Sequence, residues 1–322
     1  MTVALPYVIQ ELVTFLIPFA ILAILALGLN LQWGHTGLFN AGAAGFYAIG
    51  AYTAAFLVTA PAPPTAFYAG HLGGFSQNFA VGVATAFVLA AAAGSFIGIL
   101  TLKLREDYLA IATLALAEVV RVFLRNAESL TGGVIGVLDI PRPFDALGLR
   151  GPESDAALAL LLVGFVVLMI LVLDRITDAP WGRTLRAVRE DEQAAQVLGK
   201  DTFFVKLQAF AIGCGIMGAA GAFLAIYSRS INSDFFVPFT TFSAFVVVIL
   251  GGSGNNKGVV LGAAIFFFFD WLSVRVKDYL PPEVADRIAD YRLMAIGIVL
   301  ILLVMFRPQG LLPERRFVPR RD

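Results

Sequence analysis

The chain is poor in charge. Only 14% of its 322 residues are Asp, Glu, Lys or Arg, and 23 basic and 23 acidic residues leave no net charge at pH 7. Soluble domains average about 25% charged residues, so this composition favours a protein surrounded by lipid. A nucleic-acid partner is disfavoured as well, because the chain has no basic surplus to neutralise phosphates.

Residues that bind metals or form cross-links are also scarce. A single cysteine, Cys214, excludes an intrachain disulfide and a thiolate metal cluster, and its apolar surroundings predict a small buried side chain. Two histidines, His35 and His71, are too few for a histidine-based metal site. Residues 213–218 match the dinucleotide-binding pattern G-x-G-x-x-G, but no strand precedes them, as that fold requires. The glycine-rich residues 251–258 lack the Gly-Lys-Ser/Thr of a phosphate-binding Walker A loop. We therefore expect no metal, bound cofactor or catalytic residue, and any ATP must be used by another chain.

Apolar residues are abundant, at 59% of the chain with a mean hydropathy of +0.83. Runs of about 20 such residues, the length that crosses a bilayer, recur along the sequence. We predict an all-α polytopic membrane bundle of nine spans, with eight or ten as alternatives, and residues 1–322 as one domain. The run at 239–251 is short and the run at 39–60 is rich in glycine, so either is a candidate broken helix. The predicted spans are 10–30, 39–60, 79–102, 107–126, 156–174, 203–227, 239–251, 258–273 and 291–306.

The loops are unequal in positive charge. With nine spans, fourteen Lys and Arg residues fall on the side of the odd connections and the C-terminus, and eight fall on the other side. Positive charge is retained in the cytoplasm. The bias predicts a periplasmic N-terminus and a cytoplasmic C-terminus.

Residues 174–202 form a polar island, with eleven charged residues between two apolar runs. We expect two short helices here, with Asp178 capping the turn before Pro180 and Gly199 ending the second. Ala194 and Ala195 would let a partner surface approach closely. A merely solvated loop is the alternative. The expected apolar stripe consists of Leu185, Val188, Ala195 and Leu198.

Ionisable residues within spans are costly and usually face a bundle interior or a cavity. Glu118 and Arg121 lie three residues apart on one predicted helix, so they can pair on one face. Both a structural pair and the lining of a translocation path remain open. His35, Thr36 and Asn40 stand where glycine permits non-helical backbone, and they are further candidates for the path.

Two glycine-rich stretches occupy early and late positions, 34–50 and 251–262. Corresponding interrupted segments in two halves of a transporter indicate a site near the membrane midplane. The two stretches agree in composition and not in residues, so a pseudo-repeat is one interpretation of them.

Several segments together resemble a known family. Residues 192–199 read Glu-Gln-Ala-Ala-Gln-Val-Leu-Gly and resemble the EAA loop of ABC importer permeases, with Gln193 at the family's glutamate position. Over nearly the entire chain, the order and spacing of motifs resemble LivM-type permeases of branched-chain amino acid importers. The matching segments are 28–31, 49–53, 108–114, 131–133, 182–183, 186–192, 250–254 and 307–311, with Gly34, Gly37, Gly42, Glu118 and Asn126.

The resemblance implies a multi-pass subunit of the bacterial inner membrane that pairs with a second, similar permease. It also implies a periplasmic protein that delivers leucine, isoleucine or valine, and two cytoplasmic ATP-binding subunits that power transport. Residues 175–202 would then be the cytoplasmic loop that couples to those ATPases. The coupling residues implied are Arg183, Arg186, Arg189, Glu190, Glu192, Gln193, Ala194, Ala195 and Gly199.

Other functions stay open at this point. Related permeases carry urea, short amides or sugars, and the apolar walls of a path do not identify its solute. An ion-coupled secondary transporter is an alternative of another class, although it would favour more buried carboxylates and would not need the polar island. An intramembrane enzyme is disfavoured by the scarcity of catalytic side chains.

Overall fold

The computed structural model describes residues 7–61, 73–144, 148–149, 151–277, 281 and 287–314, and each predicted apolar run lies on a helix. Most of the connection between the predicted spans 39–60 and 79–102, and part of the connection between 258–273 and 291–306, lie outside the described residues. The helices are α1 (Tyr7–Leu29), η1 (Asn30–Gly34), α2 (Ala43–Val58), α3 (Phe79–Thr101), α4 (Glu106–Asn126), α5 (Glu128–Thr131), α6 (Pro152–Asp178), α7 (Pro180–Glu190), α8 (Glu192–Val197), α9 (Thr202–Ser228), η3 (Ser233–Phe236), α10 (Pro238–Gly251), α11 (Asn256–Lys277) and α13 (Ile288–Phe306).

The described residues build helices and no strand, apart from one isolated antiparallel bridge between Val137 and Ile231. Five helical segments are long and apolar enough to cross a bilayer, and α2 and α10 are shorter apolar helices. The protein is therefore an all-α membrane bundle, as predicted. The five segments are Gln10–Gly34, Phe79–Thr101, Pro152–Asp178, Thr202–Ser228 and Asn256–Lys277.

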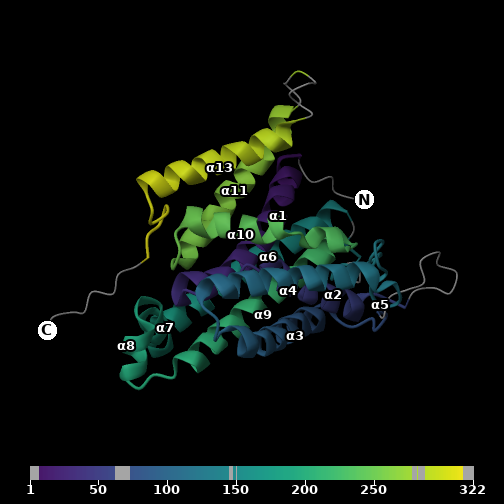
Figure 1. The fold of residues 1–322 in the computed structure, drawn as a ribbon. Helices are drawn as coiled ribbons and strands as arrows, with labels where there is room; N and C mark the ends of the chain where they lie inside the picture. Colours follow the sequence, from purple (N-terminus) through teal and green to yellow (C-terminus); the bar gives the residue numbers. More distant parts are fainter. Residues whose placement is uncertain are drawn as a thin grey trace.

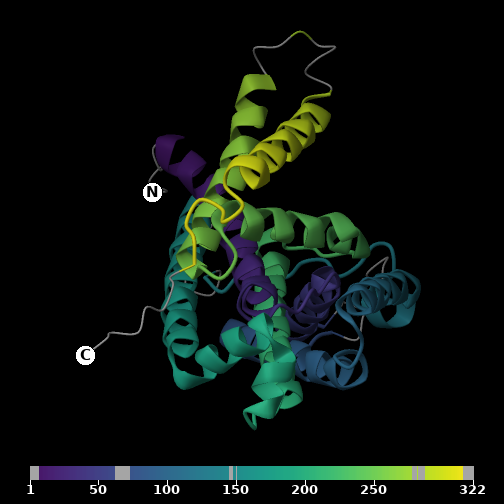
Figure 2. The same cartoon turned by 60° about the vertical axis from the view of Figure 1, so that its left-hand side comes forward.

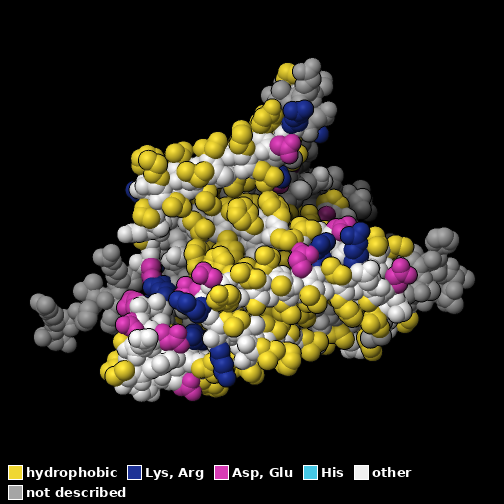
Figure 3. Space-filling model, in the orientation of Figure 1, with side chains coloured by type: hydrophobic (Ala, Val, Ile, Leu, Met, Phe, Trp, Pro, Cys, Tyr) yellow, Lys and Arg dark blue, Asp and Glu magenta, His cyan; other side chains and the backbone are white. Residues whose placement is uncertain are grey.

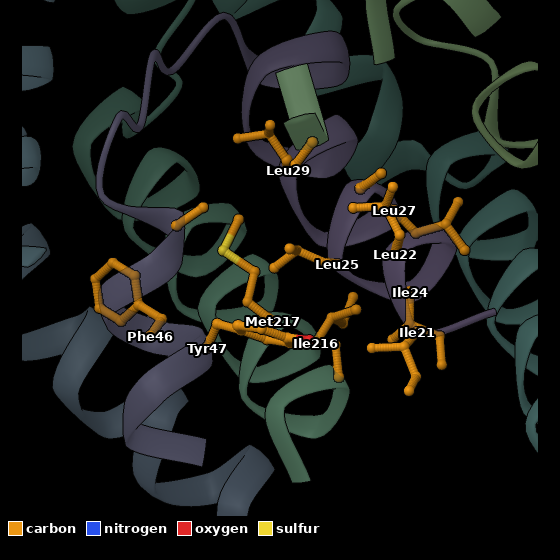
Figure 4. Packing of buried hydrophobic residues seen from close by; sticks show 14 of the residues in the cluster. Ile21, Leu22, Ile24, Leu25, Leu27, Leu29, Phe46, Tyr47, Ile216 and Met217 are labelled. Carbon is orange, nitrogen blue, oxygen red and sulfur yellow. The ribbon is translucent and has the colours of Figure 1, made fainter. Parts of the chain in front are cut away.

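Helix α9 lies at the centre of the bundle and packs against α1, α2 and α3. In the most apolar 18-residue stretch of α9, 83% of the residues are buried inside the protein, whereas the same fraction for α3 is 22%. Figure 4 shows buried side chains of α1, α2 and α9 meeting in this core, among them Leu25, Tyr47 and Met217. Cys214 is fully buried on α9, as its apolar surroundings predict.

Small residues set the distance between α9 and α2. A Cβ atom added to Gly50 would stand 2.0 Å from the carbonyl oxygen of Gly218, and one added to Gly221 would stand 2.0 Å from that of Tyr47. The two backbones thus touch directly. Lipid offers little hydrophobic drive for helix association, so close van der Waals contact of this kind has to hold the helices together.

Two interruptions of helical backbone meet at one end of the bundle. α1 passes into the π-helix η1, and α2 begins only at Ala43, after a non-helical stretch. α10 ends at Gly251, and α11 follows a short turn. The side chain of Asn30 accepts a hydrogen bond from the backbone N–H of Gly254 at 2.9 Å, which joins the two interruptions. The two glycine-rich stretches therefore lie side by side at this end.

The bundle has two different ends. α7 and α8 lie at one end, on the left in Figure 1, where α13 also finishes, and α5 lies at the other. In Figure 3, charged side chains gather towards both ends, and broad hydrophobic surface covers the helices between them. This distribution matches a bilayer that surrounds the middle of the molecule.

The close approach of α2 and α9 gives a stability prediction. We expect Gly50→Val to lower the free energy of unfolding by about 1–3 kcal/mol or more, because the added carbons overlap the backbone of Gly218. Thermal unfolding in detergent measures the effect. The matched control is Gly164→Val on α6, where an added Cβ would meet no atom within 4 Å. Equal stability of the two variants would contradict the packing described here.

Candidate functional site

The polar island folds into the two short helices that the sequence predicts, α7 and α8. Pro180 occupies the first turn of α7, but Ala179 is its N-cap and makes no side-chain bond. The expectation that Asp178 caps α7 is wrong, because Asp178 is the last residue of α6. Two other side chains of the island do cap helices. Asp191 accepts a hydrogen bond from the backbone N–H of Ala194 at 2.9 Å at the start of α8, and Asp201 accepts one from that of Phe204 at 3.0 Å at the start of α9.

The apolar stripe of the island faces the chain's own helices. Leu185, Val188 and Ala195 are buried, so Ala195 does not lie on the outward face. Leu198 was expected in the same stripe but is 78% exposed, and Val197 beside it is 88% exposed. The outward surface of α8 is thus more apolar than the sequence pattern indicates. Five of the coupling residues implied by the resemblance are also exposed. They are Arg183, Glu190, Gln193, Ala194 and Gly199.

Side-chain bonds anchor α8 to the start of α9. Glu192 pairs with Lys206 at 2.6 Å and accepts a hydrogen bond from the Thr202 hydroxyl at 3.1 Å. Gln196 donates to the same hydroxyl at 2.9 Å. Gly199 has a φ of +77°, the left-handed conformation expected of a helix stop. The second helix of the island therefore has a fixed orientation on the bundle.

Helix α7 is anchored by two arginines. Arg186 donates to the backbone carbonyl of Thr177 at 3.2 Å, which closes the corner between α6 and α7. Arg189 donates to the carbonyl of Gly34 and to the carboxylate of Glu314. Between α7 and the C-terminal segment lies an open cleft of about 700 Å³. Its lining residues are Arg183, Arg186, Ala187, Arg189, Glu190, Ser253, Pro308, Gln309, Pro313 and Glu314.

A buried polar network crosses from η1 through the start of α11 to α6, beside the island. Asn30 donates to the side-chain oxygen of Asn256 at 2.9 Å, and Asn256 donates to Asp174 at 2.8 Å. Sequence reasoning did not pair Asn30 with Asn256, because 226 residues separate these two partners. The network ties three helix ends into one unit.

His35 lies beside this network, directly after the candidate span Gln10–Gly34. It lines a cavity of about 40 Å³ together with Asp174, Asn256 and other polar residues. Burial, with a smaller contribution from the positive charges of Arg186 and Arg189, lowers the pKa of His35 to about 4. The imidazole is therefore neutral at physiological pH.

Thr36 and Asn40 are buried and bonded within their own segment. Thr36 donates to the carbonyl of Leu31 at 2.9 Å, and Asn40 donates to the side-chain oxygen of Gln32 at 2.8 Å. Gln32 in turn donates to the carbonyl of Phe210 on α9 at 2.7 Å. These side chains hold the irregular backbone between α1 and α2 in place. Sequence reasoning missed Gln32, which links that segment to the central helix.

Glu118 and Arg121 form the ion pair that their spacing predicts. The Arg121 guanidinium donates to Glu118 Oε2 at 2.9 Å from Nε, and a second nitrogen lies 2.8 Å away. The side chains are 34% and 22% exposed on α4. Neither residue lines the cavity at His35, so the structure places the predicted path residues in two separate groups.

Comparison with known proteins identifies the family. The family model described as branched-chain amino acid transport system / permease component matches residues 11–304. The chain belongs to this family. No solved structure gave a significant match.

Curated relatives agree with that assignment. The chain is 34% identical to the high-affinity branched-chain amino acid transport system permease protein LivM of Escherichia coli K12 over 316 residues, which cover 91% of this chain and 68% of the relative. It is 29% identical to a probable LivM of Methanocaldococcus jannaschii over 93% of this chain and 92% of the relative. The LivH permease of Escherichia coli K12 is 27% identical over 65% of this chain and 68% of the relative. The protein is thus an integral membrane permease component, as the motifs indicated.

The burial of neutral His35 predicts a pH dependence of stability. The folded state binds the His35 proton with a pKa of about 4, whereas the ordinary value is 6.5. The unfolded state therefore takes up this proton first, and the permease should lose up to roughly 3 kcal/mol of stability as the pH falls from about 6.5 to about 4. Thermal unfolding in detergent across this range should show a smaller loss for His35→Gln. Identical pH profiles for the two proteins would contradict the buried neutral state.

Proposed function

We propose that this chain is a permease subunit of an ATP-binding cassette importer that carries leucine, isoleucine or valine across the bacterial inner membrane. A periplasmic binding protein delivers the amino acid, and separate cytoplasmic subunits hydrolyse ATP. The observation that carries the proposal is the outward face of α7 and α8, a rigid surface at one end of a family member. Membership of a branched-chain amino acid permease family supports the substrate class.

The functions of the named relatives favour this function over the alternatives. The LivM relatives are described as branched-chain amino acid permeases, which weighs against urea or short amides as the solute. The likeness to both LivM and LivH proteins supports a second, similar permease as the partner within the membrane. An ion-coupled transporter would have no use for an anchored surface such as α7–α8.

In this proposal the chain crosses the membrane nine times, with the N-terminus in the periplasm and the C-terminus in the cytoplasm. The excess of Lys and Arg on one side, fourteen against eight, supports the orientation. The position of α7 and α8 at the end where α13 finishes agrees with it (Figure 1). The opposite end, near α5, then faces the binding protein.

The ATPase subunits dock on the exposed residues of the polar island. Val197 and Leu198 supply apolar contact area there, because both side chains are largely exposed. The small side chain of Ala194 lets the partner approach closely. The buried residues Leu185, Val188 and Ala195 transmit force to the bundle because they pack against it.

The translocation path passes the Glu118–Arg121 pair. Glu118 lies eight residues before the end of α4 at Asn126, hence about 12 Å along the helix from that end, and in this proposal α4 crosses the bilayer. A partly exposed ion pair at this depth is costly against lipid, so protein or water has to cover it. We place the second permease against this face of α4, with the path between the two subunits. His35 and its cavity lie at the cytoplasmic end, where Thr36 and Asn40 shape the backbone.

The test of the proposed function is reconstitution of the complete complex, with both permeases, the ATPases and the binding protein, in liposomes. We expect ATP-dependent accumulation of labelled leucine and none of labelled urea. Accumulation of urea in preference to leucine would refute the substrate class.

The docking proposal predicts the effect of charge on α8. Val197→Asp and Leu198→Asp should reduce co-purification of the ATPase subunits by roughly tenfold, because each places a carboxylate in an apolar contact. Both variants should still insert. The matched control is Val134→Asp, another exposed valine, which follows α5 at the opposite end of the bundle. Normal ATPase binding by both α8 variants would refute the docking surface.

The path proposal predicts the result of a charge swap on α4. Glu118→Arg combined with Arg121→Glu keeps an ion pair with the same spacing but reverses the charges that a solute meets. Membrane insertion and stability of the double variant should be close to those of the wild type, and its leucine uptake should be at least about tenfold lower than that of the wild type. Full recovery of uptake would assign the pair a structural role alone.

A further inference from the structure

Arg189 joins three segments that are far apart in the sequence. Its guanidinium donates to the backbone carbonyl of Gly34 and, at 2.7 Å, to the carboxylate of Glu314. Its aliphatic stem lies along Gly37, where an added Cβ would stand 3.1 Å from Arg189 Cγ. One side chain on α7 therefore contacts the interruption after α1 and the C-terminal segment together.

The carbonyl of Gly34 is the last one of η1, the π-helix that ends the first span. The two carbonyls just before it accept hydrogen bonds from the same segment. The backbone N–H of Leu38 donates to the Gln32 carbonyl at 2.8 Å, and that of Gly37 donates to the Trp33 carbonyl at 3.0 Å. Arg189 supplies the donor for Gly34 from outside. A positive charge at this position also complements the negative end of the helix dipole.

Glu314 connects Arg189 to the other interruption, between α10 and α11. The backbone N–H groups of Leu311 and Leu312 donate to the carbonyls of Leu250 and Gly251, at 3.1 and 3.0 Å. The C-terminal segment thereby satisfies carbonyls at the end of α10, and Figure 2 shows it curving beside the turn before α11. The carboxylate of Glu314 itself lies against Gly254 in that turn. The salt bridge therefore links Arg189 to the turn before α11, because the C-terminal segment that carries Glu314 is hydrogen-bonded to the end of α10.

The two interruptions are also bonded to each other. Asn30 accepts from the N–H of Gly254 and donates to Asn256, both at 2.9 Å. A displacement of Arg189 would therefore move the ends of α1, α10 and α11 as one group. No other arginine of α7 is placed this way among the described contacts, because Arg186 bonds to the neighbouring corner and Arg183 is exposed.

We propose that Arg189 is the positioning residue that carries the movement of α7 to both interrupted spans. The inference rests on the proposed docking of ATPases on α7 and α8. When the ATPases displace α7, the guanidinium pulls on the Gly34 carbonyl and on Glu314, and the two interruptions shift together. Arginine suits the task because its rigid fork holds two acceptors at once, whereas lysine is a single point charge.

The experiment uses the complete reconstituted complex and measures leucine uptake per ATP hydrolysed. Arg189→Ala should keep the ATPase subunits bound and ATP hydrolysis within about twofold, while uptake per ATP falls roughly tenfold, the scale of a lost charge-assisted hydrogen bond. Gln309→Ala, on the wall of the same cleft but outside the α7–α8 docking surface, is the matched control and should couple normally. Normal uptake per ATP in Arg189→Ala would overturn the proposal.

Two further variants separate the two bonds. Glu314→Gln keeps the shape of its side chain and weakens only the salt bridge, so it should lower uptake per ATP by less than Arg189→Ala does. The double variant Arg189→Glu with Glu314→Arg restores a salt bridge, but a carboxylate cannot donate to the Gly34 carbonyl, so coupling should stay lost. Full recovery in the double variant would overturn the role of Gly34.

The outcome also distinguishes this inference from the proposed function. If the wild-type complex binds no ATPase or needs no ATP for uptake, the proposed function fails and the inference fails with it. If the wild type couples normally and Arg189→Ala does too, only the inference fails. Should Arg189→Ala not assemble, Glu314→Gln decides, because unchanged uptake per ATP in that variant contradicts the transmission through Glu314.

Discussion

The structure depends on direct backbone contact between α9 and the helices around it. A Cβ atom added to Gly28 on α1 would stand 2.7 Å from the carbonyl oxygen of Gly213. One added to Gly94 on α3 would stand 2.6 Å from the side chain of Cys214. Larger side chains would force α1 and α3 away from the central helix. Because lipid tails are as apolar as the helix surfaces, such close fits supply cohesion that hydrophobicity cannot. The tightly packed core then gives the end of the bundle a firm base.

At the end of the bundle that carries the polar island, side chains bond to the interrupted segments, where regular helical hydrogen bonds are missing. Non-helical backbone is tolerated at membrane depth only where protein covers it or water reaches it. Here Gln32, Asn30 and Arg189 cover the interruption after α1, and each forms a hydrogen bond to a distant segment. The interruptions are thus well defined, and a small movement of the island acts on bonded groups and not on loose loops.

The sequence predicted the helices well because each apolar run forms a helix, and five helical segments also have the length and composition of a span. Local spacing sufficed for the Glu118–Arg121 pair, which needs only the geometry of one helix. It also sufficed for the two helices of the polar island and for the stop at Gly199. These features depend on neighbours within a few residues.

Features that depend on distant neighbours escaped sequence reasoning. The rotation of α8 exposes Leu198 and buries Ala195 because Glu192 and Gln196 bond to the start of α9, which no periodicity reveals. The cap expected from Asp178 failed because α6 continues through that residue. Partners such as Asn30 and Asn256 are visible only after the chain has folded. The order of the motifs identified the family, and the contacts suggested how its parts act together.

The central claim is that this chain forms a passage and takes its energy from other subunits. The most direct measurement compares liposomes that hold the purified chain alone with liposomes that hold the full complex. Given ATP inside and binding protein with leucine outside, the full complex should concentrate leucine, and the chain alone should not do so under any ion gradient. Accumulation of leucine by the chain alone, driven by protons or sodium, would contradict the account.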